Sequence, residues 1–296
     1  MLEEDKDGLH NLIERELNSH NKIIKPDFSQ KTGREFLAVY LQSKFEQLKD
    51  FDSCANNPIF TYVSPNFIES FSRRLISSPD KRIMIGVTGE SASGKSTLCK
   101  AMSNVIKSFK MPVSILATDN YFNDISDLIK QYGTFDDLRD NGYDVDSPES
   151  FQLDVLKKDL ELLAHGTDIY APEYLPNGTG ISVPNSKFVQ ANKIIIVEGM
   201  ATMYKDIKDI FDIKVYVETD IEIRKERFLH RAFTERNQDF ANAKKHWEYI
   251  LVAGEKYVKP SKTNADLILN GNSNMEYFCQ LLEYLHTITN NFGDKQ

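Results

Sequence analysis

The feature that most constrains the fold of this chain is the segment from Gly89 to Ser96, which reads GESASGKS. It matches the pattern G-x-x-x-x-G-K-[S/T] and follows a short apolar run at 82–88 (RIMIGVT). Such a run is typical of a strand buried on both faces of a parallel sheet, while the apolar spacing over 95–110 predicts a helix. A glycine-rich turn between a strand and a helix N-terminus directs backbone N–H groups and a helix dipole at phosphate groups. The spacing therefore predicts that this turn binds a nucleoside triphosphate.

Two side chains of this loop have predicted chemical roles. The Lys95 ammonium is expected on the β- and γ-phosphates, and the Ser96 hydroxyl is expected to bind Mg²⁺. The residues predicted to bind the nucleotide are Gly89, Glu90, Ser91, Ala92, Ser93, Gly94, Lys95, Ser96 and Thr97. The loop alone does not separate a small-molecule kinase from a GTPase, a motor or a regulatory switch.

Short apolar runs alternate with helical patterns after the loop. Further strands are expected at 112–118, 193–197, 213–217 and 267–269, and helices are expected to begin at Ser147-Pro148-Glu149 and at about Asp220. This alternation predicts an α/β, P-loop NTPase-type three-layer fold with a mainly parallel sheet. Residues 1–80 have apolar residues at helical spacing instead, interrupted by a short loop or extended stretch between Pro58 and Pro65. This pattern predicts an N-terminal helical extension ahead of an α/β domain at 81–296.

Composition excludes several classes of protein. The chain has 296 residues and a formal net charge of −8, which opposes nucleic-acid binding. No apolar stretch is long enough for a membrane span, and the acidic N-terminus has no signal-peptide pattern. Cys54, Cys99 and Cys279 lie too far apart in sequence for a CxxC pair, so we expect free thiols and a cytoplasmic location. The six histidines show no ligand-like spacing, and Trp247 is interpreted as a packing residue.

Three carboxylates follow or flank the predicted elements. Asp119 follows the strand predicted at 112–118, where ligands collect in an α/β sheet, so its carboxylate can accept the proton of a substrate hydroxyl. Glu198 ends the apolar run at 193–197, where its carboxylate suits an indirect role toward Mg²⁺, through a water molecule or through a residue that binds the ion. Asp146 lies in an acidic stretch and can recognise a diol. The alternatives are a capping residue for Asp119, a surface turn for Glu198 and a solvated face for Asp146.

Four arginines lie on the helix predicted from about residue 220 or at its end. Arg227 and Arg231 share a face of that helix, since four residues separate them. Arginines that fold over phosphates stabilise a transferring phosphoryl group. The full set is Arg224, Arg227, Arg231 and Arg236. Because glutamates are interleaved with these arginines, an exposed helix with salt bridges is the alternative.

Six segments, taken in order, resemble the uridine kinase and phosphoribulokinase family of P-loop kinases over about residues 82–290. They are GESASGKST (89–97), TDNYF (118–122), YDVDSPESF (143–151), IIIVEGM (194–200), VETDIEIRKERFLHRAFTER (217–236) and KPSKTNADLIL (259–269). The resemblance implies a kinase domain at 81–296 with a lid at about 220–245. It also implies ATP- and Mg²⁺-dependent phosphoryl transfer to a hydroxyl of a small metabolite, a nucleoside such as uridine or cytidine being the first expectation. ATP and a small-molecule acceptor are then the expected partners, with neither nucleic acid nor membrane, and a homo-oligomer is left open.

The resemblance also implies roles for individual residues. Asp119 and Lys95 would be catalytic, together with the lid arginines Arg231 and Arg236. The implied substrate-binding residues are Asp119, Tyr121, Asp146 at the ribose hydroxyls and Tyr174 near the base. Ser96 and Glu198 would serve the metal.

The sequence departs from uridine kinases in three places. Residues 175–180 lack the histidine that contacts the base in those enzymes, Phe228 stands where the lid helix usually has an arginine, and Asn237-Gln238 replaces their usual G-R. An N-terminal extension of similar length precedes the phosphate loop in bacterial pantothenate kinases. A pantothenate kinase, a sugar or sugar-phosphate kinase, and a non-catalytic nucleotide sensor that holds a partner through residues 1–80 therefore remain alternatives.

Overall fold

The computed structural model describes residues 81–273 apart from 109–111, 176 and 236–238, together with 52–54, 56–65 and separate positions between 46 and 78. The strands are β1 (Phe60–Val63), β2 (Ile83–Thr88), β3 (Val113–Ala117), β4 (Ile169–Tyr174), β5 (Ser182–Val189), β6 (Ile194–Glu198), β7 (Ile213–Glu218) and β8 (Leu267–Asn270). The α-helices are α4 (Lys95–Ser108), α5 (Ser126–Tyr132), α6 (Phe135–Asp140), α7 (Leu153–Ala164), α8 (Ile221–Thr234) and α9 (Phe240–Ala253). Short helical turns are η2 (Thr118–Tyr121), η3 (Pro148–Ser150), η4 (Met200–Met203), η5 (Lys208–Ile210), η6 (Gly254–Val258) and η7 (Lys259–Asn264).

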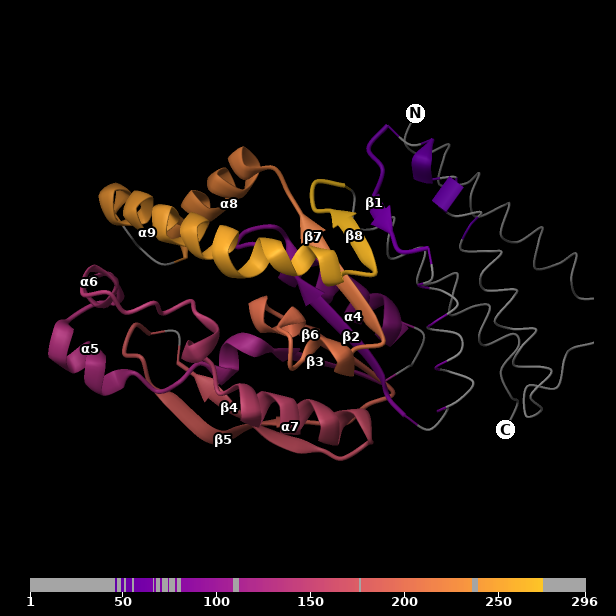
Figure 1. Cartoon of the computed structure of the whole chain (residues 1–296), viewed down its shortest axis with the longest axis horizontal. Helices are drawn as coiled ribbons and strands as arrows, with labels where there is room; N and C mark the ends of the chain where they lie inside the picture. The colour runs from indigo at the N-terminus through magenta and orange to yellow at the C-terminus, as the bar shows by residue number, and fades with distance from the viewer. Residues whose placement is uncertain are drawn as a thin grey trace, which may run out of the picture.

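Six strands form the main sheet in the order β1-β8-β7-β2-β6-β3 (Figure 1). All neighbours are parallel except β1, which pairs antiparallel with β8 at one edge. β4 and β5 form a separate antiparallel hairpin. The predicted α/β fold with a mainly parallel sheet is thus confirmed, and the strands expected at 82–88, 112–118, 193–197, 213–217 and 267–269 are β2, β3, β6, β7 and β8.

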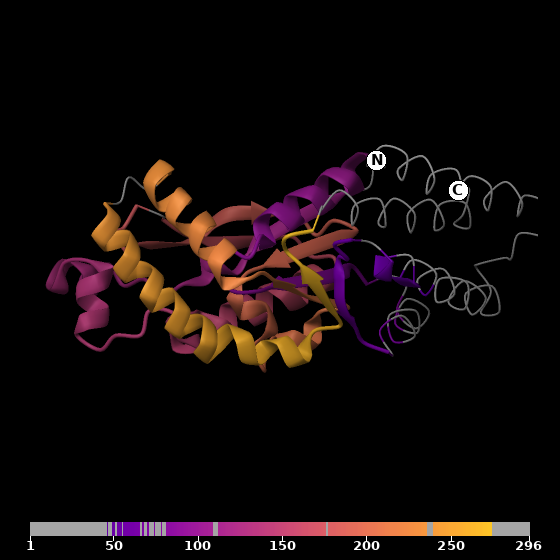
Figure 2. The same ribbon diagram turned by 90° about the horizontal axis from the view of Figure 1, so that it is seen from above.

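Alternating residues of the central strand β2 build two cores, one on each face of the sheet. Ile85 and Val87 pack with Leu98 and Met102 of α4 on one face. Met84 packs on the other face with a cluster that includes residues of α7 and of the β4–β5 hairpin. Figure 2 shows α4 and α9 on opposite sides of the sheet. Helices on both faces are what all-apolar parallel strands require, and this arrangement completes the three layers.

One strand from residues 1–80 belongs to the main sheet. Residues 60–63 lie in the loop or extended stretch expected between Pro58 and Pro65, and they form β1, which joins the edge of the main sheet. Ile59, which is 1% exposed, belongs to the core on the α4 side. Most of residues 1–80 lie outside the described residues, so the helical character of that region stays a prediction.

Two other local expectations differ from the structure. Ser147-Pro148 begins the short turn η3, whereas the long helix α7 begins at Leu153. The hairpin of β4 and β5 was not expected from the sequence. In the part of the chain that the structure describes, no helix has the length and apolar character needed to cross a membrane.

Candidate active site

Three neighbouring parallel strands bring the candidate residues to one edge of the sheet. Glu198, the last residue of β6, pairs in register with Val87 of β2 on one side and with Ala117 of β3 on the other. The phosphate loop begins two residues after Val87, and Asp119 follows Ala117 by two residues. Loop, Glu198 and Asp119 therefore meet at the carboxyl end of the sheet, where α/β proteins bind ligands.

The phosphate loop is ordered around the lysine that closes it. The Lys95 Nζ donates hydrogen bonds to the carbonyl oxygens of Gly89, at 2.7 Å, and of Glu90, at 2.9 Å. Burial lowers the pKa of the Lys95 ammonium, and the carboxylates of Asp119 and Glu198 oppose that effect. The lysine is thus held at the mouth of the loop, between backbone carbonyls and two acidic side chains.

Oxygen atoms suited to Mg²⁺ lie beside the loop. The Ser96 hydroxyl, in the first turn of α4, donates to Glu198 Oε2 at 2.7 Å. Among the described residues, no group of three or more His, Cys, Asp or Glu side chains could hold a metal by itself. Mg²⁺ is usually bound through one or two protein oxygens plus phosphate oxygens and water. The Ser96–Glu198 pair therefore fits that ion at the predicted position.

Asp119 is placed by a tight contact between two turns. It lies in η2, whose Thr118 is buried, and Gly199 follows Glu198 with a φ of 132°. A Cβ at Gly199 would collide with the Thr118 hydroxyl and would lie 3.4 Å from Asp119 Oδ1. Only glycine readily adopts this conformation and leaves this space, so the close approach of the two turns depends on it.

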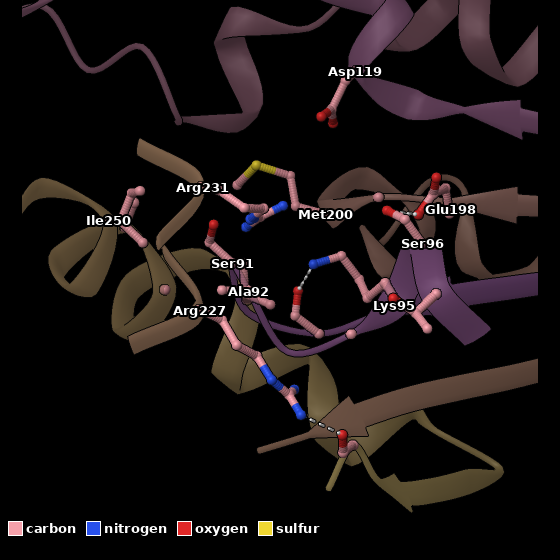
Figure 3. A pocket seen from close by; sticks show the side chains of 18 of the residues that line it. Ser91, Ala92, Lys95, Ser96, Asp119, Glu198, Met200, Arg227, Arg231 and Ile250 are labelled. Atoms are coloured by element: carbon pink, nitrogen blue, oxygen red, sulfur yellow. Dashed lines mark hydrogen bonds between the residues drawn. The ribbon is translucent and has the colours of Figure 1, made fainter. Parts of the chain in front are cut away.

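One cavity of about 870 Å³ joins these parts. Figure 3 shows Asp119 entering it from the side opposite Lys95 and the phosphate loop, with Arg231 and Met200 between them. The predicted residues that line it are Gly89, Ser91, Ala92, Gly94, Lys95, Ser96, Thr97, Asp119, Asp146, Glu198 and Arg231. A loop for phosphates and carboxylates that can receive a hydroxyl thus share one cavity.

Two arginines of α8 face this cavity, and a third supports the loop from behind. Arg227 and Arg231 line the cavity, and Arg227 Nη2 donates to the carbonyl of Gly271 at 3.2 Å. The buried Arg224 instead forms an ion pair with Glu90 at 2.7 Å and donates to the carbonyl of Ser91. The prediction that Arg227 and Arg231 share a face is confirmed, whereas Arg224 is directed at the outer side of the loop.

Residues 84–276 match the family model described as Phosphoribulokinase / Uridine kinase family. The chain belongs to this family. Its curated relatives include a uridine kinase from Staphylococcus epidermidis, 30% identical over 64% of this chain and 89% of that protein. Uridine-cytidine kinase A from Dictyostelium discoideum is 29% identical over 63% of this chain, but this chain spans only 36% of that protein. The protein is accordingly a small-molecule kinase.

Solved structures of the same fold are less similar in sequence. A putative fructose transport system kinase from Silicibacter sp. TM1040 superposes with a TM-score of 0.50 at 17% identity, over 68% of this chain and 95% of that one. At this identity the likeness concerns the fold, which agrees with the P-loop kinase architecture.

Several residues that were predicted to bind the nucleotide or the substrate do not line the cavity. Tyr121 is fully buried and donates its hydroxyl to Asp159 at 2.8 Å, so its side chain supports the core and does not line the cavity. Glu90 binds Arg224, and the Ser93 side chain is buried, so neither lines the cavity. Arg236, like Asn237 and Gln238, lies outside the described residues.

Aromatic rings lie close to Asp119, at the cavity wall and behind it. Tyr174, in β4, does not line the cavity, but its ring centroid is 5.4 Å from that of Phe122, which does. Phe122 in turn stacks on Phe151 at 4.2 Å. Sequence reasoning singled out Tyr121 and missed Phe122, although both belong to the TDNYF segment.

Asp146 lines the same side of the cavity and has a cationic neighbour. Burial raises the pKa of its carboxyl, and the guanidinium of Arg139, 3.2 Å away, opposes the rise. Two histidines interpreted from sequence as ordinary residues, His230 and His246, also line the cavity. His230 lies three residues after Arg227 on α8, so the helical spacing of the arginines could have indicated it.

Phe228, the departure in the lid helix, belongs to a core between helices. It is buried with Ala232, Ala243 and Trp247, and its ring centroid is 5.5 Å from that of Trp247. This cluster joins α8 to α9, and Ala92 and Ile250, which line the cavity, pack against it. The packing role expected for Trp247 is therefore confirmed.

Proposed function

We propose that this kinase transfers the γ-phosphoryl group of Mg·ATP to a hydroxyl group of a nucleoside. The observation that carries the proposal is the single cavity of about 870 Å³ lined by the phosphate loop, by Asp119 and by Asp146. Its two ends differ in chemistry, since one has backbone N–H groups and cationic side chains and the other has carboxylates and an aromatic ring. Uridine kinases among the relatives support a nucleoside as the acceptor.

At the donor end, the residues bind and neutralise phosphate groups. Backbone N–H groups of the loop and the N-terminus of α4 face the phosphates, and Lys95 supplies a positive charge to them. Ser96 and Glu198 would hold Mg²⁺, which neutralises charge on the phosphate oxygens when bound. Arg227 and Arg231 on α8 line this cavity, and in the proposed reaction their guanidinium groups stabilise the charge of the transferring group.

At the acceptor end, Asp119 orients and deprotonates the nucleophile. Its carboxylate accepts the proton of the acceptor hydroxyl as that oxygen forms a bond to the γ-phosphorus, and the bond from phosphorus to the β,γ-bridging oxygen breaks. Asp146 is placed to accept hydrogen bonds from the neighbouring sugar hydroxyls. Phe122, supported by Phe151 and Tyr174, offers an aromatic surface to a base or another flat group.

The test measures ADP release from Mg·ATP by the purified full chain, with uridine, cytidine, pantothenate or sugar phosphates as separate additions. We expect release that depends on a nucleoside and is lost in Lys95→Ala. Release with pantothenate or a sugar phosphate alone would contradict the nucleoside and retain the kinase. ATP binding with no acceptor-dependent release would favour the nucleotide sensor.

A further inference from the structure

A short segment ahead of β1 holds one wall of the nucleotide end of the cavity. This segment, residues 57–59, lies well before the family match, which begins at residue 84. It contacts the turn that follows β8, residues 270–273, across more than two hundred positions of sequence. The contact therefore joins the site to a part of the chain outside the family domain.

The side-chain amide of Asn57 forms two hydrogen bonds to this turn. Its Oδ1 accepts a hydrogen bond from Asn270 Nδ2 at 2.9 Å, and its Nδ2 donates to the carbonyl of Asn272 at 3.2 Å. The Ser273 hydroxyl donates to the carbonyls of Asn57, at 3.2 Å, and Pro58, at 2.9 Å. The two residues on either side of Gly271 are thus bound by one amide.

Gly271 lies between this amide and the phosphate loop. It lines the cavity, and its carbonyl accepts the hydrogen bond from Arg227. A Cβ at Gly94 in the loop would lie 3.8 Å from the Gly271 carbonyl oxygen and 3.7 Å from Arg227 Nη1. A Cβ at Gly271 would collide with the Ser93 carbonyl and the Thr219 hydroxyl, so the turn cannot move further toward the loop. The backbone N–H of Gly271 donates to the carbonyl of Glu218 at 2.7 Å, and on the outer side the turn is held by Asn57 and its neighbours.

We propose that Asn57 is a positioning residue for the nucleotide: it holds the 270–273 turn so that the Gly271 carbonyl keeps Arg227 against the donor side of the cavity. The inference rests on the proposed function in one respect, namely that this end of the cavity receives ATP. Asp119 and the acceptor residues enter from the opposite side, so loss of Asn57 affects the donor and leaves the acceptor unchanged.

A purely structural role of Asn57 would give a different combination of changes in ATP affinity and thermal stability. The β1–β8 pairing and the hydrogen bond from the Asn270 backbone N–H to the carbonyl of Ile59, at 2.8 Å, attach this segment to the sheet without the Asn57 side chain. If Asn57 only strengthened that attachment, its loss would change thermal stability and not the affinity for nucleotide.

The experiment compares Asn57→Ala with Asn56→Ala in the full chain. Asn56 is the adjacent exposed asparagine, so it controls for the residue type and the location. Mg·ATP binding is measured by titration calorimetry, KM values for ATP and for the acceptor by steady-state kinetics, and the Tm by thermal unfolding. Asn270→Ala removes the partner amide on the other side of the contact. It also removes the Asn270 Oδ1 that accepts from the Asn272 backbone N–H at 3.0 Å, so Asn57→Ala is the decisive variant.

We expect Asn57→Ala and Asn270→Ala to weaken ATP binding and raise the KM for ATP by about threefold to tenfold, as expected for the loss of one or two exposed hydrogen bonds. The KM for the acceptor and the values for Asn56→Ala should stay near those of the unmodified chain. Equal ATP affinity in Asn57→Ala and Asn56→Ala would overturn the inference, as would a fall in Tm without a change in ATP affinity. If the unmodified chain bound no ATP at all, the proposed function would fail and this inference with it.

Discussion

Asp119 enters the cavity from the side opposite Lys95, so the loss of its carboxylate should lower turnover more than it weakens ATP binding (Figure 3). Asp119→Asn keeps the shape of the side chain but removes a proton acceptor. We expect kcat to fall by about 10²- to 10⁴-fold, the range for loss of a general base, with the KM for ATP nearly unchanged. Asp209→Asn, at an exposed carboxylate of η5, is the control in the same steady-state assay. Wild-type turnover by Asp119→Asn would remove the proton-accepting role.

The pairing of Arg139 with Asp146 makes a prediction about pH. Burial raises the pKa of the Asp146 carboxyl and Arg139 opposes the rise, so Arg139→Met should raise that pKa further. The carboxylate accepts hydrogen bonds from sugar hydroxyls at both oxygens, whereas protonation turns one oxygen into a donor and removes the charge that strengthens these bonds. As the pH falls, the variant should therefore lose acceptor binding at a higher pH than the unmodified chain.

This shift is measured as the acidic limb of the pH profile of kcat/KM for the acceptor. Lys157→Met, at an exposed lysine of α7, serves as the control. An acidic limb at the same pH in Arg139→Met and in the unmodified chain would show that Asp146 does not control acceptor binding.

The sequence located the backbone of the site better than the direction of its side chains. The motif around Lys95 and Ser96 fixes a loop and a helix start, and both residues lie where the motif implies. In the TDNYF segment, by contrast, the residues form a tight turn, so Asp119 faces the cavity while Tyr121 enters the core. Spacing alone does not give the direction of each side chain in such a turn. Phe122, which lines the cavity, was therefore overlooked.

At the scale of elements, α9 and the turn η6 that follows it are joined by side-chain hydrogen bonds to α6 and to the residues after α6. Asp140, the last residue of α6, accepts hydrogen bonds from Lys245 Nζ at 2.7 Å and from the Tyr249 hydroxyl at 2.6 Å. Asp144 accepts from Lys256 and Tyr257 in the same way. Figure 1 shows α5 and α6 opposite α8 and α9 at the same end of the molecule.

These contacts predict that Asp140→Asn loosens α9 without destabilising the sheet. Because the residues are exposed, we expect amide hydrogen exchange across residues 240–253 to increase by only about twofold to fivefold. Asp127→Asn is a matched control, since Asp127 pairs with Lys130 within α5 and bridges no elements. Equal amide exchange rates in α9 for both variants would show that the contacts of Asp140 do not hold α9 against α6.

The elements predicted correctly are those with a dense apolar pattern. The run at 193–197 became β6 because residues 194–197 are all buried, as a central parallel strand requires. The hairpin strand β5 was missed because most of its residues are exposed, so it has no apolar run. The helix start at Ser147 was misplaced because Ser147 makes no capping contact to η3, and the Ser150 hydroxyl bonds the carbonyl of Asp144 instead.

For the whole molecule, the main difference from expectation is that the sheet extends into the N-terminal region. β1 has only four residues, between Pro58 and Pro65, and although the aromatic and β-branched residues of its sequence FTYV favour a strand, so short a run does not show which sheet it joins. Its pairing with β8 spans most of the chain, and such a non-local contact leaves no periodic signal in the sequence. The sequence could therefore indicate an extended stretch at this place but not its pairing with the kinase sheet.

This architecture predicts that β1 and the kinase sheet unfold together. Asp52 is 1% exposed, and its carboxylate accepts hydrogen bonds from the backbone N–H groups of Ile59, at 3.0 Å, and Phe60, at 2.9 Å. Asp52→Ala leaves these donors without their partner, which costs about 1–3 kcal/mol. In a domain of roughly 200 residues, each kcal/mol lowers the Tm by about 2–4 °C.

We expect scanning calorimetry of the full chain to record the sheet and β1 in one transition, and Asp52→Ala to lower the Tm of that transition by several degrees. Asp50→Ala is the matched control, because the nearby contact of Asp50 with the Ser53 hydroxyl uses its backbone carbonyl, which alanine retains. If Asp52→Ala moved only a separate minor transition and left the main one unchanged, β1 would be an appendage to the sheet. A shared shift would instead mean that the nucleotide site is supported by a strand from outside the family domain.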